Sequence, residues 1–146
     1  MSQQTAAQLS QRLHELFSQG KHADVVAMAD DEIETVAYAL GMQVKGKDAF
    51  RTFVMSFADA FPDIRITPKN VVASGDLVCI EFDAFGTNTG SMMTPDGPVP
   101  PTGREVTFHV CEVHEWQNGK LVRLVNYQDS ASIMRQLGLL PEPAGL

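Results

Sequence analysis

A stripe of aromatic side chains between residues 47 and 61 limits the possible folds of this chain more than any other segment. The stripe consists of Phe50, Phe53, Val54, Phe57 and Phe61. Steps of three and four residues place these side chains on one face of a helix. Burying such a face stabilises a fold by several kcal/mol, at about 25 cal/mol per Å² of apolar surface. The stripe therefore predicts a helix over 47–61 that packs into a core and ends at Pro62.

The segments before the stripe predict two more helices and a strand. Residues 5–19 carry apolar side chains at helical spacing, and Gly20 follows as a helix stop. We expect a shorter helix over 22–29. Segment 33–40 is rich in strand-forming residues and is expected to be a strand.

After the stripe the pattern changes to strands. We expect strands over 64–67 and 71–73, interrupted at Pro68, and over 77–87, 106–116 and 121–128. Residues 88–103 hold four of the eight prolines and three of the eleven glycines, so they are expected to be a loop. Asn118-Gly119 predicts a tight hairpin, and a last short helix is expected to begin at Asp129 or Ser130. Helices followed by strands are typical of an α+β fold with an antiparallel sheet.

Charge and composition exclude several classes of function. The 146 residues include 11 basic and 18 acidic side chains, so the net charge of −7 disfavours binding to nucleic acids and to anionic membranes. Two cysteines are too few for a disulfide scaffold or a cysteine-rich zinc site. No apolar run has the length of a membrane span, and no signal peptide is recognised at the start. We therefore expect one soluble, cytoplasmic domain over residues 1–146.

Familiar metal and nucleophile patterns are not found in the sequence. His109 and His114 are five residues apart on a predicted strand, which would put them on opposite faces, so no metal site is predicted. Cys111 shares a face with His109, but a buried cysteine is commonly a small apolar side chain. There is no glycine-rich phosphate loop and no nucleophile elbow.

The predicted hairpin singles out one carboxylate. Counting outward from Asn118-Gly119 pairs Arg123 with His114, Val125 with Glu112, Tyr127 with Val110, and Asp129 with Phe108. Asp129 then lies beside aromatic and aliphatic side chains, which would raise its pKa and make it usable as a general acid and base. Two alternatives stay open: Asp129 could cap the last helix, and Glu112 could pair diagonally with Arg123. In this register His109 lies on the other face from Asp129.

Seven short segments resemble one known family in their order along the chain. They are Gly46-Lys47-Asp48-Ala49-Phe50, Phe61-Pro62-Asp63, Gly86-Thr87-Asn88-Thr89-Gly90, Pro101-Thr102-Gly103-Arg104, Asn118-Gly119-Lys120, Tyr127-Gln128-Asp129 and Gln136-Leu137-Gly138-Leu139. The series is similar to the SnoaL-like polyketide cyclases, or ester cyclases, of the NTF2-like superfamily. The resemblance covers residues from about 8 to 140.

The resemblance implies a fold and a chemistry. The fold would be an NTF2-like cone, a curved mixed or antiparallel sheet packed against N-terminal helices, in a homodimer. A pocket aspartate near the end of the last strand serves the family as acid and base in an aldol ring closure, and Asp129 matches it. No metal or organic cofactor is needed for that reaction. Two positions depart from the family: Asn88 replaces a histidine and cannot exchange a proton, and Val125 replaces a common aromatic residue.

The leading hypothesis is a cofactor-independent cyclase for a hydrophobic, carbonyl-containing, polyketide-like small molecule, with Asp129 as the catalytic residue. Tyr38, Asn88, His109 and Tyr127 are the candidate substrate-binding residues, and Tyr38, His109 and Tyr127 are the expected donors to carbonyl oxygens. A ligand-binding or dimerisation module of the same fold is the alternative. Dehydration, isomerisation or epoxide hydrolysis is a further one. Family epoxide hydrolases use an Asp-Arg-Asp set, and the sequence offers one convincing pocket aspartate.

Overall fold

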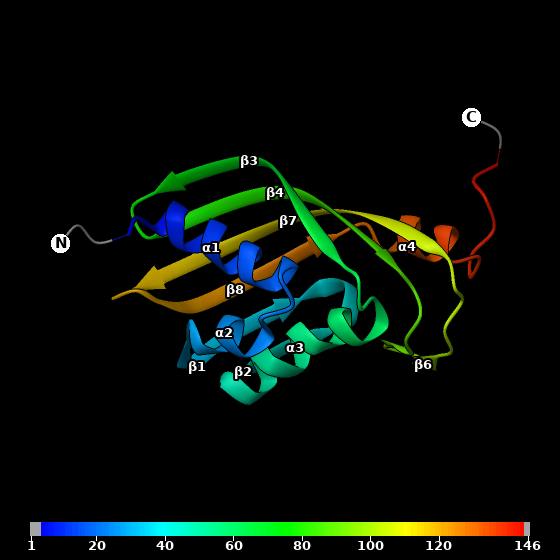
Figure 1. The fold of residues 1–146 in the computed structure, drawn as a ribbon, viewed down its shortest axis with the longest axis horizontal. Helices are drawn as coiled ribbons and strands as arrows, with labels where there is room; N and C mark the ends of the chain where they lie inside the picture. The colour runs from blue at the N-terminus through cyan, green and yellow to red at the C-terminus, as the bar shows by residue number, and fades with distance from the viewer. Residues whose placement is uncertain (1–3, 145–146) are drawn as a thin grey trace.

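The computed structural model describes residues 4–144 as a curved six-stranded sheet with helices packed against one face (Figure 1). The strands are β1 (Ala29–Ala37), β2 (Met42–Lys45), β3 (Arg65–Ser74), β4 (Leu77–Thr87), β7 (Glu105–Gln117) and β8 (Lys120–Gln128). Their order across the sheet is β2-β1-β8-β7-β4-β3. All neighbours are antiparallel except β1 and β8, which run parallel, so the sheet is mixed.

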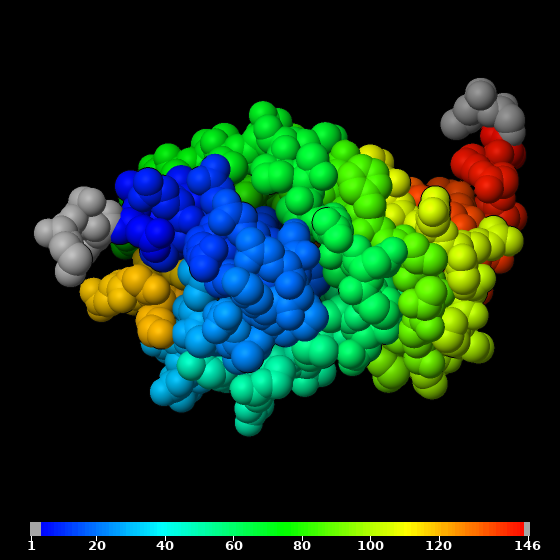
Figure 2. Space-filling view, in the orientation of Figure 1, coloured from blue at the N-terminus to red at the C-terminus, as the bar shows by residue number. Residues whose placement is uncertain are grey.

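Three helices cover the inner face of the sheet, and a fourth follows the last strand. They are α1 (Ala6–Ser18), α2 (His22–Ala27), α3 (Lys47–Ala60) and α4 (Ser130–Gln136). Helix α1 begins at a capping box in which Thr5 and Gln8 satisfy each other's backbone N–H groups. The space-filling view shows α1, α2 and α3 as a continuous layer in front of the sheet (Figure 2). No helix within residues 4–144 has the length and hydropathy of a bilayer-spanning segment.

The aromatic stripe forms the predicted helix α3 and is buried against the sheet. Phe50, Phe53 and Phe61 are each at most 5% exposed. Phe61 packs edge-on against Phe108 of β7, with ring centroids 4.9 Å apart. The expectation of an α+β fold with the stripe in the core is therefore confirmed.

Three parts of the chain differ from the predicted pattern. The expected strand over 33–40 begins earlier, at Ala29, and gives way after Ala37 to the 3-10 helix η1 (Tyr38–Leu40). Strand β2 was not predicted, and the expected loop 88–103 contains the small hairpin β5 (Met92–Thr94) and β6 (Gly97–Val99). These pieces are three or four residues long, too short for a repeating pattern to identify them.

The predicted register of the last hairpin is wrong beyond its second pair. Gln117 faces Lys120 and Trp116 faces Leu121 as expected, but a bulge follows, so that Glu115 pairs with Arg123. The extra residue on β8 shifts every later pair by one, and a shift of one residue exchanges the two faces of a strand. As a result Asn126 and Gln128 face the helices, while Tyr127 faces outward.

Candidate functional site

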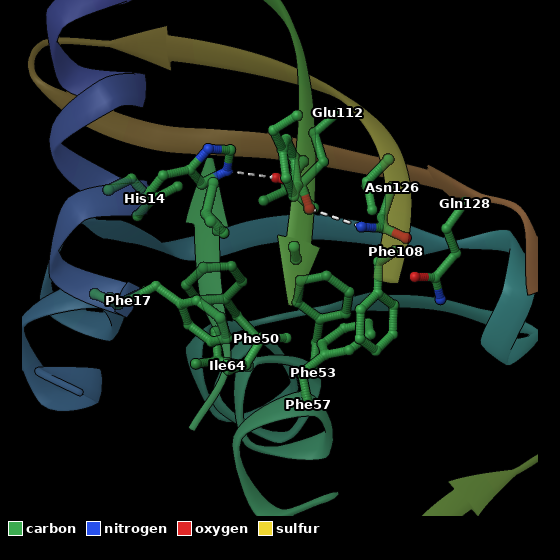
Figure 3. Close-up of a pocket in the computed structure, with 18 residues that line it drawn as sticks. His14, Phe17, Phe50, Phe53, Phe57, Ile64, Phe108, Glu112, Asn126 and Gln128 are labelled. Atoms are coloured by element: carbon green, nitrogen blue, oxygen red, sulfur yellow. Dashed lines mark hydrogen bonds and ion pairs between the residues drawn. The ribbon is translucent and has the colours of Figure 1, made fainter. Parts of the chain in front are cut away.

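A narrow cavity lies between the inner face of the sheet and helices α1 and α3 (Figure 3). Its volume is about 60 Å³, which suits a few water molecules or a slender part of a small organic ligand. Apolar side chains form nearly all of the wall. Among them are Phe50, Phe53 and Phe57 of α3, Phe82 of β4 and Phe108 of β7. Part of the aromatic stripe therefore contacts the cavity as well as the core.

Four polar residues interrupt this apolar wall: His14, Glu112, Asn126 and Gln128. Three of them meet at one carboxylate. Glu112 Oε1 accepts a hydrogen bond from His14 Nε2 at 2.9 Å, and Glu112 Oε2 accepts one from Asn126 Nδ2 at 2.7 Å (Figure 3). His114 Nε2 lies 2.9 Å from the same Oε1 atom. We call His14, Glu112, His114 and Asn126 the carboxylate cluster.

Local structure explains how the chain assembles the carboxylate cluster. Alternation along β7 sends Phe108, Val110, Glu112, His114 and Trp116 to the inner face. Register places Asn126 of β8 directly opposite Glu112. His14 lies beside Leu13 on the buried face of α1, which packs over this part of the sheet.

Behind the carboxylate, a chain of hydrogen bonds fixes His114. Trp116 Nε1 donates to Ser10 Oγ at 2.8 Å, and Ser10 Oγ lies 2.8 Å from His114 Nδ1. Because an ionised carboxylate only accepts, both histidines must carry a proton on Nε2. Burial lowers the pKa of His114 and favours its neutral form, in which Nδ1 accepts a hydrogen bond from the Ser10 hydroxyl. All three of these residues are at most 2% exposed.

Electrostatics support an ionised carboxylate beside this neutral histidine. Burial by itself would raise the pKa of Glu112, but the hydrogen bonds from His114 and His14 hold its pKa below the usual range. Burial lowers the pKa of His114, against the raising influence of the Glu112 hydrogen bond. Glu112 is therefore a permanent negative charge at neutral pH.

Two polar atoms of the carboxylate cluster have no partner within the described part of the chain. They are Nδ1 of His14 and Oδ1 of Asn126, and both are buried. Buried polar atoms are usually hydrogen-bonded, so such atoms suit a site that completes its hydrogen bonds with a ligand or water. In Figure 3 the Asn126 amide lies between Glu112 and Gln128, above the ring of Phe108.

The same cluster contains the residues that could hold a metal ion. His14, Glu112 and His114 each offer a ligand atom, and these atoms lie within 4.8 Å of one another. Two histidines and a carboxylate can bind a transition metal. However, the nitrogen and oxygen atoms that face each other are already joined as donor and acceptor. Hydrogen bonding accounts for the arrangement.

The structure corrects the prediction that Asp129 lies in an apolar pocket. Asp129 is exposed and is the N-cap of α4, where its Oδ1 accepts a hydrogen bond from the Ser132 backbone N–H at 3.1 Å. Strand β8 ends at Gln128 and α4 begins at Ser130, so Asp129 lies between them, at the position that caps the helix. The alternative interpretation of Asp129 as a helix cap is confirmed.

The two predicted tyrosines also lie outside the cavity. Tyr38 in η1 is 64% exposed, and Tyr127 is 47% exposed on the outer face of β8. Their rings pack on each other, with centroids 5.3 Å apart. The bulge in the last hairpin explains Tyr127, because it turns that side chain away from the helices.

Asn88 and His109 have structural partners elsewhere. Asn88 is fully buried, and its amide donates to the carbonyls of Ala60 and Gly90 while accepting from Thr102, so it ties the loop 88–103 to α3. His109 is exposed on the outer face and bonds to Asp83 at 2.7 Å. Neither of them lines the cavity.

The predicted diagonal pair of Glu112 and Arg123 does not form. Arg123 Nε lies 3.7 Å from Glu34 Oε1 on the outer face, whereas Glu112 points inward. The sequence does hold a signal for Glu112 and His114, since both occupy inward positions between Val110 and Trp116. A charged side chain in the buried half of an alternating strand needs partners, which indicates a polar site.

Comparison with known proteins places this geometry in context. The family model of the SnoaL-like polyketide cyclases matches residues 7–137. No curated protein matches the sequence. Solved structures share the fold at low sequence identity.

Three of these structures illustrate the range of sequence identity and structural similarity. IdmH from Streptomyces antibioticus, a proposed polyketide cyclase, is 21% identical with a TM-score of 0.77, over 92% of this chain and 99% of that one. AclR from Streptomyces galilaeus, a proposed hydroxylase, is 21% identical with a TM-score of 0.79, over 93% and 82%. A LEH-like epoxide hydrolase from M. tuberculosis is 15% identical with a TM-score of 0.68, over 90% and 88%. At these identities the likeness shows the fold.

Proposed function

Because the chain belongs to the SnoaL-like polyketide cyclase family, we propose that it is a cofactor-independent cyclase that closes a ring in a hydrophobic, carbonyl-containing small molecule. The family and its structural neighbours support an enzyme of cyclase or isomerase type. One observation carries the finer proposal: a buried, ionised carboxylate, Glu112, stands in the wall of an apolar cavity beside unpartnered polar atoms.

Glu112 takes the role that the sequence suggested for Asp129. A carboxylate has about four lone-pair positions, and Glu112 uses three of them for His14, His114 and Asn126. The free position belongs to Oε2, the oxygen that accepts a single hydrogen bond. This oxygen can accept a proton from a carbon acid that enters the cavity. A C–H group between two carbonyls is acidic enough for a carboxylate that is shielded from water.

Asn126 and Gln128 supply the polar contacts for the substrate. One N–H of the Asn126 amide donates to Glu112, which leaves the second N–H for an enolate oxygen. The unpartnered Oδ1 of Asn126 can accept from an enol or hydroxyl group. Gln128 follows two residues later on the same strand face and offers a further donor and acceptor.

The ring closure then proceeds as an intramolecular aldol reaction. Glu112 removes a proton from the carbon between two carbonyls, and the electron pair of that C–H bond becomes an enolate. The enolate carbon attacks a distant carbonyl carbon of the same molecule, so that a C–C bond forms and that carbonyl becomes an alkoxide. The protonated Glu112 returns its proton to the alkoxide, which restores the carboxylate.

A soluble model substrate tests the proposal. In nonane-2,4,8-trione the carbon between the 2- and 4-carbonyls can attack the 8-carbonyl to close a six-membered ring, which proton NMR follows directly. We expect wild-type protein to accelerate this closure and Glu112→Gln to lose the acceleration. Glu105→Gln, an exposed change on the same strand, is the matched control and should keep the wild-type rate. Equal rates for wild type and Glu112→Gln would reject the role of Glu112.

A second candidate function is small-ligand binding without catalysis. The hydrogen bonds that hold Glu112 favour it, because they lower the basicity of the carboxylate. Binding of the trione without any acceleration would select this alternative. Epoxide hydrolysis by an Asp-Arg-Asp set is less well supported, since Glu112 is the one carboxylate among the described residues that line the cavity.

We further propose that the protein works as a homodimer in the cytoplasm. The outer face of the sheet carries exposed apolar side chains, among them Val72, Leu77, Phe85 and Tyr127. Packing this face against a second copy would bury them. Light scattering coupled to size-exclusion chromatography should give a mass twice that of the chain, and a monomer mass at micromolar concentration would reject the dimer.

A further inference from the structure

A second cavity adjoins the first. Its volume is about 40 Å³, and it is lined by η1, the β5–β6 hairpin and α4 as well as by α3. Phe57, Phe108 and Gln128 line both cavities, so these side chains lie between the two spaces. The Phe57 and Phe108 rings meet edge to face, with centroids 6.5 Å apart.

The lining of the second cavity differs from that of the first cavity, which contains residues of the carboxylate cluster. Met92, Met93 and Met134 surround it together with Leu40, Phe61 and Ile133. Methionine side chains are unbranched and polarisable, so they adapt to apolar ligands of varied shape. The described polar groups at its edge are few, and Gln128 is the one that it shares with the first cavity.

Gln128 marks the path between the two spaces. It lies two residues beyond Asn126 on β8, about 7 Å along the strand at the usual rise per residue. Gln128 lines the first cavity together with Asn126 and Glu112, and it also lines the second cavity. The first cavity alone, at about 60 Å³, is too narrow for a ligand of many atoms.

We propose that the second cavity is the subsite for an apolar tail, so that the ligand is an elongated 1,3-dicarbonyl compound with an alkyl or acyl chain. Its dicarbonyl end lies at Glu112 and Asn126, and its tail turns the rings of Phe57 and Phe108 aside to reach the three methionines. This assignment rests on the proposed function for the position of the dicarbonyl end. Phe57 and Phe108 then determine specificity for chain length.

The test compares two ligands that differ only in tail length. Binding of pentane-2,4-dione and of nonane-2,4-dione is measured by two-dimensional NMR titration of the wild-type protein. Four added CH₂ groups should tighten binding at least tenfold, because each buried CH₂ contributes about 0.8 kcal/mol. The same titrations are made with Ala39→Trp and Met134→Trp, which fill the second cavity from two different elements.

Both filling variants should bind pentane-2,4-dione like the wild type and lose the tenfold advantage of nonane-2,4-dione. Ala23→Trp adds the same bulk at an exposed position on α2, away from both cavities, so it should keep the advantage. Unchanged binding of pentane-2,4-dione in one filling variant shows that this variant folds.

Three outcomes overturn the proposal, and they separate it from the proposed function. If wild type binds the two diones equally, or if both filling variants keep the advantage, the tail does not enter the second cavity while the site at Glu112 stands. If Glu112→Gln binds pentane-2,4-dione as wild type does, the position of the dicarbonyl end fails. If neither dione binds to wild type, the proposed function and this subsite both fail.

Discussion

Glu112 and His14 are 98 residues apart in the sequence, yet Glu112 Oε1 and His14 Nε2 lie 2.9 Å apart at the wall of the cavity. This bond joins the first helix to the long strand β7. Both side chains are at most 6% exposed, so water cannot replace either partner in this hydrogen bond. The stability of the fold and the chemistry of the site therefore depend on the same contact.

Replacing the carboxylate should destabilise the protein. Glu112→Ala would leave N–H donors of His14, His114 and Asn126 buried without an acceptor, at a cost of about 3 kcal/mol in the free energy of unfolding. Urea denaturation followed by circular dichroism measures this change. The matched exposed variant Glu105→Ala should stay within about 0.5 kcal/mol of wild type. A loss below about 1 kcal/mol for Glu112→Ala would contradict the hydrogen-bond arrangement.

The rate of ring closure should tolerate mild acid. The pKa of Glu112 is held below its ordinary value of 4.5, so the basic form persists as the pH falls from 8 to 5. We expect kcat/KM for nonane-2,4,8-trione to stay level over that range and to fall only below about pH 4.5. The dependence of kcat/KM on pH is measured by stopping the reaction at set times and quantifying the product by NMR. An acidic limb centred near pH 6 would mean that a different group acts as the base.

Stability should decrease as the pH falls through the histidine range. Burial lowers the pKa of His114 below its ordinary value of 6.5, so protonation favours the unfolded chain. The contribution of neutral His114 is complete above pH 6.5 and is lost as the pH falls towards the lower pKa of the folded state. The free energy of unfolding should then drop between pH 7 and 5, by up to about 1.4 kcal/mol per pH unit.

A histidine outside the carboxylate cluster provides the comparison. Urea denaturation of His114→Gln should show a shallower dependence on pH than the wild type. His22→Gln, on α2, should keep the wild-type slope. The assignment is wrong if the two variants behave alike.

Asp129 should prove to be structural. Asp129→Ala removes the bond to the Ser132 backbone N–H and should cost about 1 kcal/mol, whereas Asp129→Asn keeps a capping side chain and should cost little. Neither variant should slow ring closure of the trione. If Asp129→Asn abolished turnover while its thermal melting matched wild type, Asp129 rather than Glu112 would be the acid and base.

The thiol of Cys111 should be unreactive. Burial, together with the nearby Cys79 thiol, raises its pKa to about 11, and the two sulfur atoms lie 3.4 Å apart. At pH 8 its thiolate fraction is about 100-fold smaller than that of free cysteine, so alkylation should be slower by a similar factor. Iodoacetamide labelling followed by peptide mass spectrometry resolves Cys111 from Cys79. Labelling of Cys111 at the rate of free cysteine would contradict the raised pKa.

Local patterns were sufficient to predict the main elements. The Phe50–Phe61 stripe, Pro62 and the Asn118-Gly119 turn each depend on neighbours within a few residues, and the elements they predict are present. The short strand β2 and the β5–β6 hairpin were missed because three or four residues carry no periodic signal. The parallel pairing of β1 with β8 joins distant segments and has no local signal either.

The sequence by itself determined that an aromatic helix covers a sheet and that the last two strands form a hairpin, because these features follow from spacing along the chain. Only the tertiary structure decided which polar residues meet. A single bulge at Glu115 and Trp116 exchanged the faces of β8, which turned Asn126 inward and Tyr127 outward. Packing of α1 then brought His14 to Glu112. Bulges and helix docking are set by the sum of distant contacts, and no spacing between neighbouring residues encodes them.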